Sequence, residues 1–271
     1  METKKVVIIT GAARGIGRAV ALKFAAASCQ LTLVDQDCDA LNDTNLIIKA
    51  TYDVPTLVCM GDITDANFQQ QIIQQTEEKF QRIDILINNA AWRSIETMRT
   101  MQLAVWEKTL AICLTAPAYL SKYSAAVMER LKIPGVIINV SSIMSERAAG
   151  YSPAYIAAKG GLESLTKELS ITYGRSGIRV LSVNPGFIDT EMSVDYTNEN
   201  GLDVNKQMAA YLLNATPLGR SGKPQEIAEA IFWLSSNQAA FITGTSLLID
   251  GGFKHNLNDY ALKQLQLPKD F

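Results

Sequence analysis

The sequence predicts an α/β fold, with helices on both faces of a doubly wound parallel sheet, in a single domain over residues 1–271. Three observations support this fold class. Short apolar, β-branched runs alternate with helical patterns along the chain, which is the order of parallel strands joined by crossover helices. The length of 271 residues suits one large domain, and no internal repeat divides it. Polar and glycine residues follow the apolar runs, where such sheets bind their ligands.

The amino-terminal segment has the pattern of a βαβ unit that binds a dinucleotide. A strand over Val6–Thr10 leads into a glycine-rich turn, Gly11–Gly17, and a helix follows over about Ile16–Ala27. The next strand, Leu31–Val34, ends at Asp35, 18 residues beyond the last glycine of the turn. The glycines let the backbone approach a pyrophosphate, and the amides at the helix start hold its charge.

The predicted cofactor preference depends on Asp35. A carboxylate at this strand end can accept hydrogen bonds from the adenosine ribose hydroxyls and would repel a 2′-phosphate. Arg14, in the glycine turn, could instead meet such a phosphate, lie beside the pyrophosphate, or be a solvated loop residue. Because no basic residue follows Asp35 directly, we expect NAD rather than NADP.

Five further strands and four helices continue the alternation. The apolar runs predict strands at Thr56–Met60, Ile83–Ile87, Val136–Val140, Val180–Val183 and Ser246–Ile249. The helical patterns lie at about Ala66–Phe80, at Met101–Arg130, onward from Ser152 and Pro153, and at Pro224–Ser235.

Candidate ligand contacts follow two of these strands. Asp62 could bond the adenine amino group or cap the next helix, although Thr64 or Asp65 fits the capping role better. The amide and small residues Asn88–Ala91 would leave room for a cofactor, or would form a plain turn.

Two segments depart from the alternation. Residues 191–215 are polar and irregular, with a weak helical patch near Lys206–Leu213, and such a long insert beyond a strand end predicts a lid over the site. The tail, Phe253–Phe271, carries scattered leucines and either packs on a neighbouring subunit or covers the site.

Ser142, Tyr155 and Lys159 form the candidate acid–base group. Tyr155 and Lys159 are four residues apart, so a helix stacks them on one face, while Ser142 follows a buried strand. Such pairs also occur on ordinary helix surfaces, and serine pairs after strands are common loop chemistry. The acid–base interpretation therefore depends on the nucleotide-binding pattern elsewhere in the chain.

Composition argues against several function classes. A net charge of −2 gives no reason to expect nucleic acid or an anionic membrane as partner. Four cysteines without CxxC spacing favour reduced thiols in a cytoplasmic protein over disulfides or a zinc site. We expect no signal peptide or membrane span, because a strand starts near the amino terminus and no apolar run is long enough. The single histidine, His255, disfavours serine–histidine hydrolase chemistry and histidine metal sites.

Taken together, these motifs resemble the short-chain dehydrogenase/reductase family over Lys5–Gly252. The matching motifs are TGAARGIG, NNAA, Ser142 with YIAAK, NPG with the following Asp189-Thr190, and DGG. The resemblance implies a Rossmann-like fold, with Tyr155 as the base in alcohol oxidation and the acid in carbonyl reduction. It implies that Lys159 binds the nicotinamide ribose and lowers the tyrosine pKa, and that Ser142 bonds the substrate oxygen.

The resemblance and the βαβ pattern together define the expected cofactor contacts, which lie after the strands. They are Gly11, Arg14, Gly15, Ile16, Gly17, Asp35, Asp62, Ile63, Asn89, Ala90, Ala91, Tyr155, Lys159, Pro185, Gly186, Ile188 and Thr190. The family likeness also implies a homotetramer, and it requires no metal.

One position departs from the family pattern. Cys113 stands where the family usually has an asparagine that completes the active tetrad and helps to hold a relay water. A cysteine cannot supply the hydrogen bonds of that amide, although the backbone there could still hold the water. We expect Cys113 to be a buried packing residue rather than a reactive thiol.

The leading functional prediction is an NAD-dependent dehydrogenase acting on a secondary alcohol, its ketone or a sugar. A 3-oxoacyl-carrier-protein reductase-like enzyme is an alternative, but it would usually favour NADPH and a basic docking patch, and Asp35 argues against it. A non-catalytic NAD-binding or sensor protein is a second alternative, suggested by Cys113. The substrate pocket is expected from residues 94–99, 143–151 and 191–215. Its polar candidates, each of which is otherwise a solvated loop charge, are Arg93, Arg99, Glu146 and Arg147.

Overall fold

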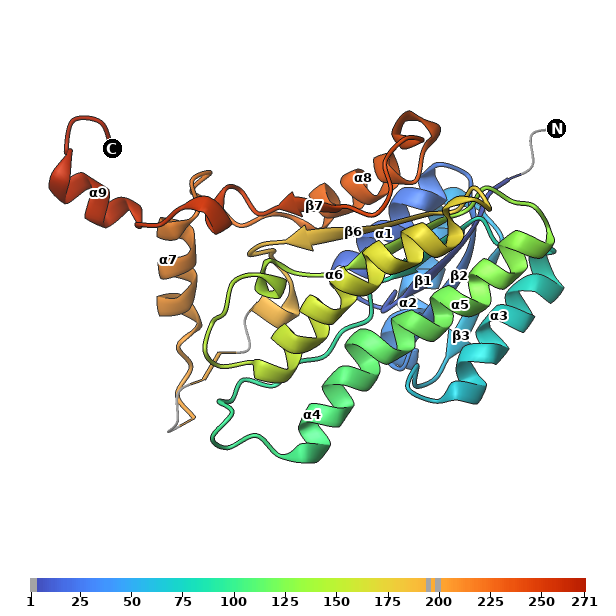
Figure 1. Cartoon of the computed structure of the whole chain (residues 1–271), viewed down its shortest axis with the longest axis horizontal. Helices are drawn as coiled ribbons and strands as arrows, with labels where there is room; N and C mark the ends of the chain where they lie inside the picture. The colour runs from blue at the N-terminus through green and yellow to red at the C-terminus, as the bar shows by residue number, and fades with distance from the viewer. Residues whose placement is uncertain (1–3, 194–195, 198–200) are drawn as a thin grey trace.

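Seven parallel strands form one sheet in the part of the chain that the structure describes, residues 4–193, 196–197 and 201–271. In this computed structural model the strand order is β3-β2-β1-β4-β5-β6-β7 (Figure 1). The strands are β1 Val6–Thr10, β2 Gln30–Asp35, β3 Thr56–Met60, β4 Ile85–Asn88, β5 Val136–Val140, β6 Arg179–Pro185 and β7 Ser246–Ile249. The chain runs outward from β1 to β3 and then returns to the other side of β1. The carboxyl ends of β1 and β4 therefore flank the crevice in which such sheets bind ligands.

Helices cover both faces of this sheet, as the alternating pattern predicts. On one face lie α1 (Gly15–Ala26), α2 (Cys38–Tyr52) and α8 (Pro224–Leu234). On the other lie α3 (Ala66–Phe80), α5 (Ala116–Arg130) and α6 (Pro153–Gly174). Because strand side chains alternate, Val7 and Ile9 of β1 pack against the first set of helices and Ile8 against the second. All three side chains are fully buried, so the central strand contributes to two separate cores.

The predicted strands are confirmed to within two residues at each end, but two helices were not predicted. One is α2, which follows the strand that ends at Asp35; the Asp37 carboxylate caps it by accepting a hydrogen bond from the Ala40 amide. The other is α9 (Tyr260–Gln266), a short helix in the tail. At the start of α3, Asp65 is the capping residue, as its position in the sequence favours.

The helix predicted over Met101–Arg130 contains an irregular turn near its middle. It begins as α4 (Leu103–Leu110), passes through a π-helical turn, η1 (Ala111–Thr115), and continues as α5. Cys113 lies in the middle of η1 and is fully buried. Such π-turns occur frequently at functional sites, and this one packs against Tyr155 on α6.

The insert and the tail lie at one end of the molecule, beyond the end toward which β6 points (Figure 1). The predicted helical patch in the insert is α7 (Asn205–Ala215), whereas residues 194–195 and 198–200 of the predicted lid lie outside the described residues. Helix α9 contacts α7 and projects past it, away from the sheet. Its Leu265 side chain is 83% exposed, so α9 adds little to the core of this chain.

Candidate active site

A cavity of about 810 Å³ opens at the carboxyl ends of the central strands. It is lined by residues from the glycine turn, from the loops after β2, β4, β5 and β6, and from α6, α7 and the start of the tail. The predicted site residues that line it are Gly11, Arg14, Gly15, Ile16, Asp35, Asn89, Ala90, Ala91, Ser142, Tyr155, Lys159, Pro185, Gly186, Ile188 and Thr190. The fold therefore brings residues from eight segments of the chain to one cavity.

The glycine turn is tightly packed against its surroundings. A Cβ on Gly17 would lie 1.9 Å from the carbonyl oxygen of Gly11, and a Cβ on Gly11 would lie 2.8 Å from the Asn89 amide nitrogen. Gly11 also has φ +67°, a conformation that side chains other than glycine rarely adopt. Gly17 itself does not line the cavity, so its function is to let the turn close behind the cavity wall.

Asn89 fastens the glycine turn to the end of β4. Its side-chain amide donates to the carbonyl oxygens of Thr10, at 3.0 Å, and Gly11, at 3.1 Å. In return, the Thr10 hydroxyl accepts hydrogen bonds from the backbone amides of Asn89 and Ala90, each at 3.0 Å. These hydrogen bonds hold the carboxyl ends of β1 and β4, which flank the crevice, in a fixed position relative to each other. The resulting cradle, too narrow for a Cβ at two glycines, fits the phosphates of a dinucleotide.

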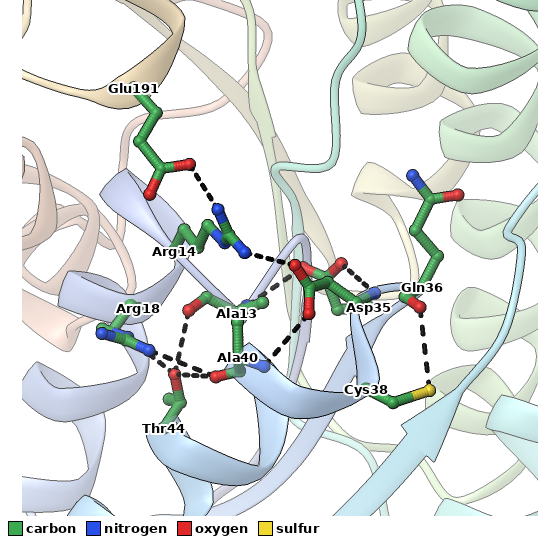
Figure 2. A network of polar contacts seen from close by, with 10 residues as sticks. Ala13, Arg14, Arg18, Asp35, Gln36, Cys38, Ala40, Thr44 and Glu191 are labelled. Atoms are coloured by element: carbon green, nitrogen blue, oxygen red, sulfur yellow. Dashed lines mark hydrogen bonds and ion pairs between the residues drawn. The ribbon is translucent and has the colours of Figure 1, made fainter.

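Asp35 lies at the edge of the cavity beside the glycine turn (Figure 2). One carboxylate oxygen accepts a hydrogen bond from the Ala13 amide and the other accepts one from the Asp37 amide, both at 3.0 Å. The carboxylate thus joins the glycine turn to the β2–α2 loop and also places negative charge where the adenosine ribose is expected.

Arg14 is held by two carboxylates, a placement that the sequence left open among three interpretations. Its guanidinium forms ion pairs with Asp37 and, at 2.7 Å, with Glu191 in the predicted lid (Figure 2). Asp35, which accepts a hydrogen bond from the neighbouring Ala13 amide, adds a third carboxylate, so this end of the cavity carries net negative charge.

Besides Gly17, two further expected cofactor contacts do not line the cavity. Asp62 and Ile63 follow β3 but do not line it. The Asp62 carboxylate instead accepts a hydrogen bond from the Thr64 amide at 2.8 Å, which is the bonding of a turn.

The candidate acid–base residues meet deep in the same cavity. Ser142, just after β5, accepts a hydrogen bond from the Met144 amide at 3.1 Å, and its hydroxyl is close enough to the Tyr155 phenol to lower the pKa of that phenol. Tyr155 and Lys159 lie one turn apart on α6, and the Lys159 ammonium is 5.5 Å from the tyrosine ring centroid. That ammonium donates to the carbonyl oxygen of Val140, at the end of β5, at 2.7 Å. Both side chains are buried.

Burial decides the ionisation of this pair. It raises the pKa of the Tyr155 phenol above its ordinary value, and Cys113 acts in the same direction, against the charge of Arg93 and the hydrogen bond with Ser142. Burial also lowers the pKa of Lys159, against the influence of Cys113 and Glu163. In the protein without a cofactor the net effect on the phenol is thus a raised pKa, with burial as its largest cause. That Lys159 lowers this pKa stays a prediction.

Because the pKa of Tyr155 is raised, we expect its phenolate to form only at unusually high pH in a spectroscopic titration. An acid whose pKa is raised keeps its proton to higher pH, so Tyr155 should ionise only above the ordinary tyrosine pKa of about 10. The measurement is the ultraviolet absorbance of phenolate, taken as wild type minus Tyr155→Phe over the pH range in which circular dichroism shows the fold intact. A difference signal appearing below the ordinary value would contradict the desolvation argument.

Cys113 is a buried packing residue with two hydrogen bonds. Its sulfur accepts from the Trp92 amide at 3.5 Å and donates to the Trp92 carbonyl oxygen at 3.4 Å. It also packs against Tyr155 and Ala158. The thiol thereby ties the loop after β4 to the π-turn next to the tyrosine.

The far end of the cavity has a mainly apolar wall. Of the three segments expected there, residues 143–151 and 191–215 contribute but 94–99 do not. Arg93 and Arg147 line the cavity, whereas Arg99 lies outside it and Glu146 forms an ion pair with Lys254. Phe253 also lines the cavity, and its carbonyl oxygen accepts a hydrogen bond from Arg147 at 2.6 Å. It was not among the named site residues, although one of the two expectations for the tail that it begins was that the tail covers the site.

Comparison with known proteins identifies the family. Residues 11–254 match the family model described as enoyl-(acyl carrier protein) reductase. Glucose 1-dehydrogenase 2 of Bacillus subtilis (strain 168) is 30% identical over 92% of this chain and 95% of its own length. This chain belongs to the short-chain dehydrogenase/reductase family. The resemblance inferred from the motifs is thus confirmed, and membership makes the chain an oxidoreductase that uses a nicotinamide cofactor.

Solved members of the family share the fold of this chain closely. Levodione reductase superposes with a TM-score of 0.89 at 29% identity, covering 93% of this chain and 98% of its own. A 4-hydroxyisoleucine dehydrogenase complexed with NADH gives a TM-score of 0.83 at 32% identity, covering 92% and 98%. Within the described residues, no helix is both long and apolar enough for a membrane span. The same residues hold no cluster of histidine, cysteine and acidic side chains that could bind a metal ion.

Proposed function

We propose that this protein transfers a hydride between NAD(H) and a secondary alcohol, the corresponding ketone or a sugar. The observation that carries the proposal is the meeting of Ser142, Tyr155 and Lys159 in the cavity that also contains the glycine cradle. A bound nicotinamide supplies the hydride acceptor or donor. The protein supplies a hydroxyl to orient the substrate oxygen, a phenol to move its proton, and an ammonium beside both.

Each of the three residues has a defined part in the proposed reaction. The Ser142 hydroxyl bonds the substrate oxygen and keeps it near the phenol with which Ser142 already interacts. Tyr155 accepts the hydroxyl proton in oxidation and donates it in reduction. Lys159, whose ammonium lies against the Val140 carbonyl at the end of β5, holds the cofactor ribose and contributes positive charge near the phenol. The positive charge of an oxidised nicotinamide offsets the desolvation that raises the tyrosine pKa.

The choice of NAD over NADP rests on the charges at the adenosine end. Asp35 lines the cavity there, and the Arg14 guanidinium is already neutralised by Asp37 and Glu191. The relative named as a 4-hydroxyisoleucine dehydrogenase is complexed with NADH, which is in keeping with this choice.

Replacing Asp35 with asparagine is expected to improve NADPH binding relative to NADH by about tenfold or more. The substitution removes a charge that repels the 2′-phosphate but keeps an oxygen that can accept from the Ala13 amide. Dissociation constants for both cofactors, from the fluorescence of the reduced nicotinamide, provide the measurement. Asp43→Asn, at an exposed position on α2, is the matched control and should leave the ratio unchanged. A wild-type protein that prefers NADPH would show the proposed preference to be wrong.

A 3-oxoacyl-carrier-protein reductase remains the competing enzyme function, because the matched family description names an acyl-carrier-protein substrate. The acids beside the glycine turn disfavour the NADPH that such an enzyme usually takes. A non-catalytic sensor is less well supported, since Cys113 leaves the acid–base residues assembled and satisfies its own hydrogen bonds.

The deciding experiment incubates the purified protein with NAD⁺ and a panel of secondary alcohols, polyols and aldoses, and follows NADH absorbance. Parallel reactions contain NADPH and a 3-oxoacyl thioester. We expect NADH to form with at least one hydroxyl compound. Turnover of the thioester alone would favour the competing reductase, and binding of NAD without turnover of any compound would favour the sensor. Homotetrameric assembly and a cytoplasmic location stay predictions from the sequence.

A further inference from the structure

A buried glutamate continues the row of acid–base side chains along α6. Tyr155, Lys159 and Glu163 follow one another at intervals of four residues, so they lie on one face of the helix over successive turns. These residues are 7%, 2% and 8% exposed, respectively. Glu163 does not line the cavity and has no part in the reaction as proposed so far. Because a carboxylate is costly to bury alone, Glu163 must gain compensating interactions inside the protein.

Two serine hydroxyls hold the Glu163 carboxylate against the sheet. The hydroxyl of Ser182, on β6, donates to Oε2 at 3.0 Å, and the hydroxyl of Ser246, on β7, donates to the same oxygen. The other oxygen, Oε1, is buried and has no hydrogen-bond partner among the described residues. None of the ion pairs formed by those residues includes this carboxylate. Its charge is therefore fixed in place but is not neutralised by a direct contact.

Lys159 is anchored on the strand next to that carboxylate. Its ammonium donates to the Val140 carbonyl oxygen, at the end of β5, at 2.7 Å. In the sheet, Ser182 of β6 pairs with Asn139, the residue before Val140. Neighbouring strands are about 4.8 Å apart and successive residues rise by about 3.3 Å, so the backbone positions of Val140 and Ser182 are about 6 Å apart. The ammonium and the carboxylate are thus held close together where little water can screen them.

The charge of Glu163 acts on the ionisation of Lys159. Burial lowers the pKa of Lys159, while Cys113 from η1 and Glu163 from its own helix oppose that effect. The causes that act on the pKa of Tyr155 do not include Glu163. The charged residues on the other segments near this part of α6, none of which is among the causes acting on Lys159, are Arg93, Glu107, Lys108, Glu146, Arg147 and Arg179. Glu163 is therefore the carboxylate that supports the ammonium of Lys159.

We propose that Glu163 is a positioning residue of the active site, whose carboxylate keeps Lys159 in its ammonium form while Tyr155 exchanges its proton. The part in catalysis rests on the proposed dehydrogenase function, whereas the coupling between the two charges does not. The serines of β6 and β7 hold the carboxylate, and the helix fixes its separation from the lysine. Lys159 can then hold the cofactor ribose, and contribute positive charge beside the phenol, at a pH at which a buried lysine without such a partner would be neutral.

The first experiment titrates Lys159 directly, without cofactor or substrate. Protein labelled with ¹³C at the lysine Cε atoms is followed by nuclear magnetic resonance as the pH rises, and the Lys159 signal is the one that Lys159→Met lacks. We expect Glu163→Gln, which removes the charge but keeps an oxygen for the serine hydroxyls, to shift this titration to lower pH. Glu168→Gln, at an exposed position on the same helix, is the matched control and should leave the titration unchanged.

Two further variants separate charge from packing. Glu163→Leu removes the charge in a second way, and the hydroxyls of Ser182 and Ser246, which are 2.7 Å apart, can then bond each other. It should shift the Lys159 titration in the same direction as Glu163→Gln. Glu163→Asp keeps the charge and should keep the titration closer to that of wild type. Melting temperatures show which variants are folded, and an unchanged Lys159 titration in a folded variant without the charge would overturn the proposal.

A second experiment tests the consequence for catalysis through the pH dependence of kcat for an alcohol that wild type oxidises. An ammonium is lost as the pH rises through its pKa, so removing the supporting carboxylate should bring that loss to lower pH. We expect the fall in kcat of Glu163→Gln to grow with pH, becoming about threefold or more larger on the alkaline side than near neutrality. A purely structural part would lower kcat by the same factor at every pH.

The two experiments distinguish failure of this inference from failure of the proposed function. A shifted Lys159 titration without oxidation of any hydroxyl compound would support the coupling and count against the dehydrogenase. Oxidation by wild type together with a Glu163→Gln profile of unchanged shape would support the dehydrogenase and overturn the part assigned to Glu163.

Discussion

Replacing Tyr155 with phenylalanine is expected to lower kcat for any oxidised substrate by about 100- to 10,000-fold, the usual contribution of a positioned acid–base group. The phenol lies in the cavity with Ser142 and Lys159, and no histidine or acid among the described lining residues of the substrate end could take over the proton. Phenylalanine keeps the ring that packs against Cys113 and Ala158, so the fold should persist. The measurement is steady-state NADH formation with a substrate that wild type turns over.

Two further measurements show whether the fall in kcat comes from loss of proton transfer rather than from a change in cofactor binding or folding. NADH affinity and melting temperature should stay close to wild type, since only a hydroxyl is removed. Tyr173→Phe is the matched control, because it removes a hydroxyl from the distal end of α6, outside the cavity, and should leave kcat unchanged. Full activity in Tyr155→Phe would refute the assigned role, and a parallel loss of NADH binding would indicate that the tyrosine has a structural part instead.

Replacing Gly17 with alanine is expected to weaken NADH binding by at least tenfold and to destabilise the fold. In an ordinary helix position this change would stabilise by about 0.5–1 kcal/mol. Here the new Cβ would lie 1.9 Å from the Gly11 carbonyl oxygen and 2.6 Å from the Asn89 side chain. Overpacking of this kind costs about 1–3 kcal/mol, and the turn must move away from β4 to relieve it. Cofactor titration and thermal melting measure the two effects.

Gly174→Ala is the matched control for that substitution. Gly174 is the last residue of α6, and a Cβ there meets nothing within 4 Å. Its melting temperature should equal or exceed that of wild type, and its NADH affinity should not change. If Gly17→Ala behaves like Gly174→Ala, the close packing of the glycine turn does not limit cofactor binding.

Particular residues show which strands, helices and cavity-lining residues could be predicted from the sequence. The strands were predictable because short runs such as Val136–Val140 are mostly apolar and β-branched, a local pattern that needs no knowledge of the rest of the chain. Most of the candidate residues that line the cavity could be named because they follow such strands, whereas Tyr155 and Lys159 were named from their spacing on one helix. Asp62 also follows β3, but it does not line the cavity and its carboxylate accepts a hydrogen bond within its own turn, so its contact with the adenine stays a prediction. The helix over Cys38–Tyr52 was missed although Asp37 caps it.

The sequence by itself determined the parallel sheet, the glycine turn and the spacing of Tyr155 and Lys159, because each depends on residues that are close along the chain. Only the tertiary structure decided the charge state and surroundings of the site. It pairs Arg14 with Glu191, brings Phe253 against Arg147, and raises the tyrosine pKa through burial. The two contacts join residues that are 177 and 106 positions apart, and the raised pKa depends on the exclusion of water. Neither the partners in such contacts nor the extent of desolvation is encoded in a local pattern.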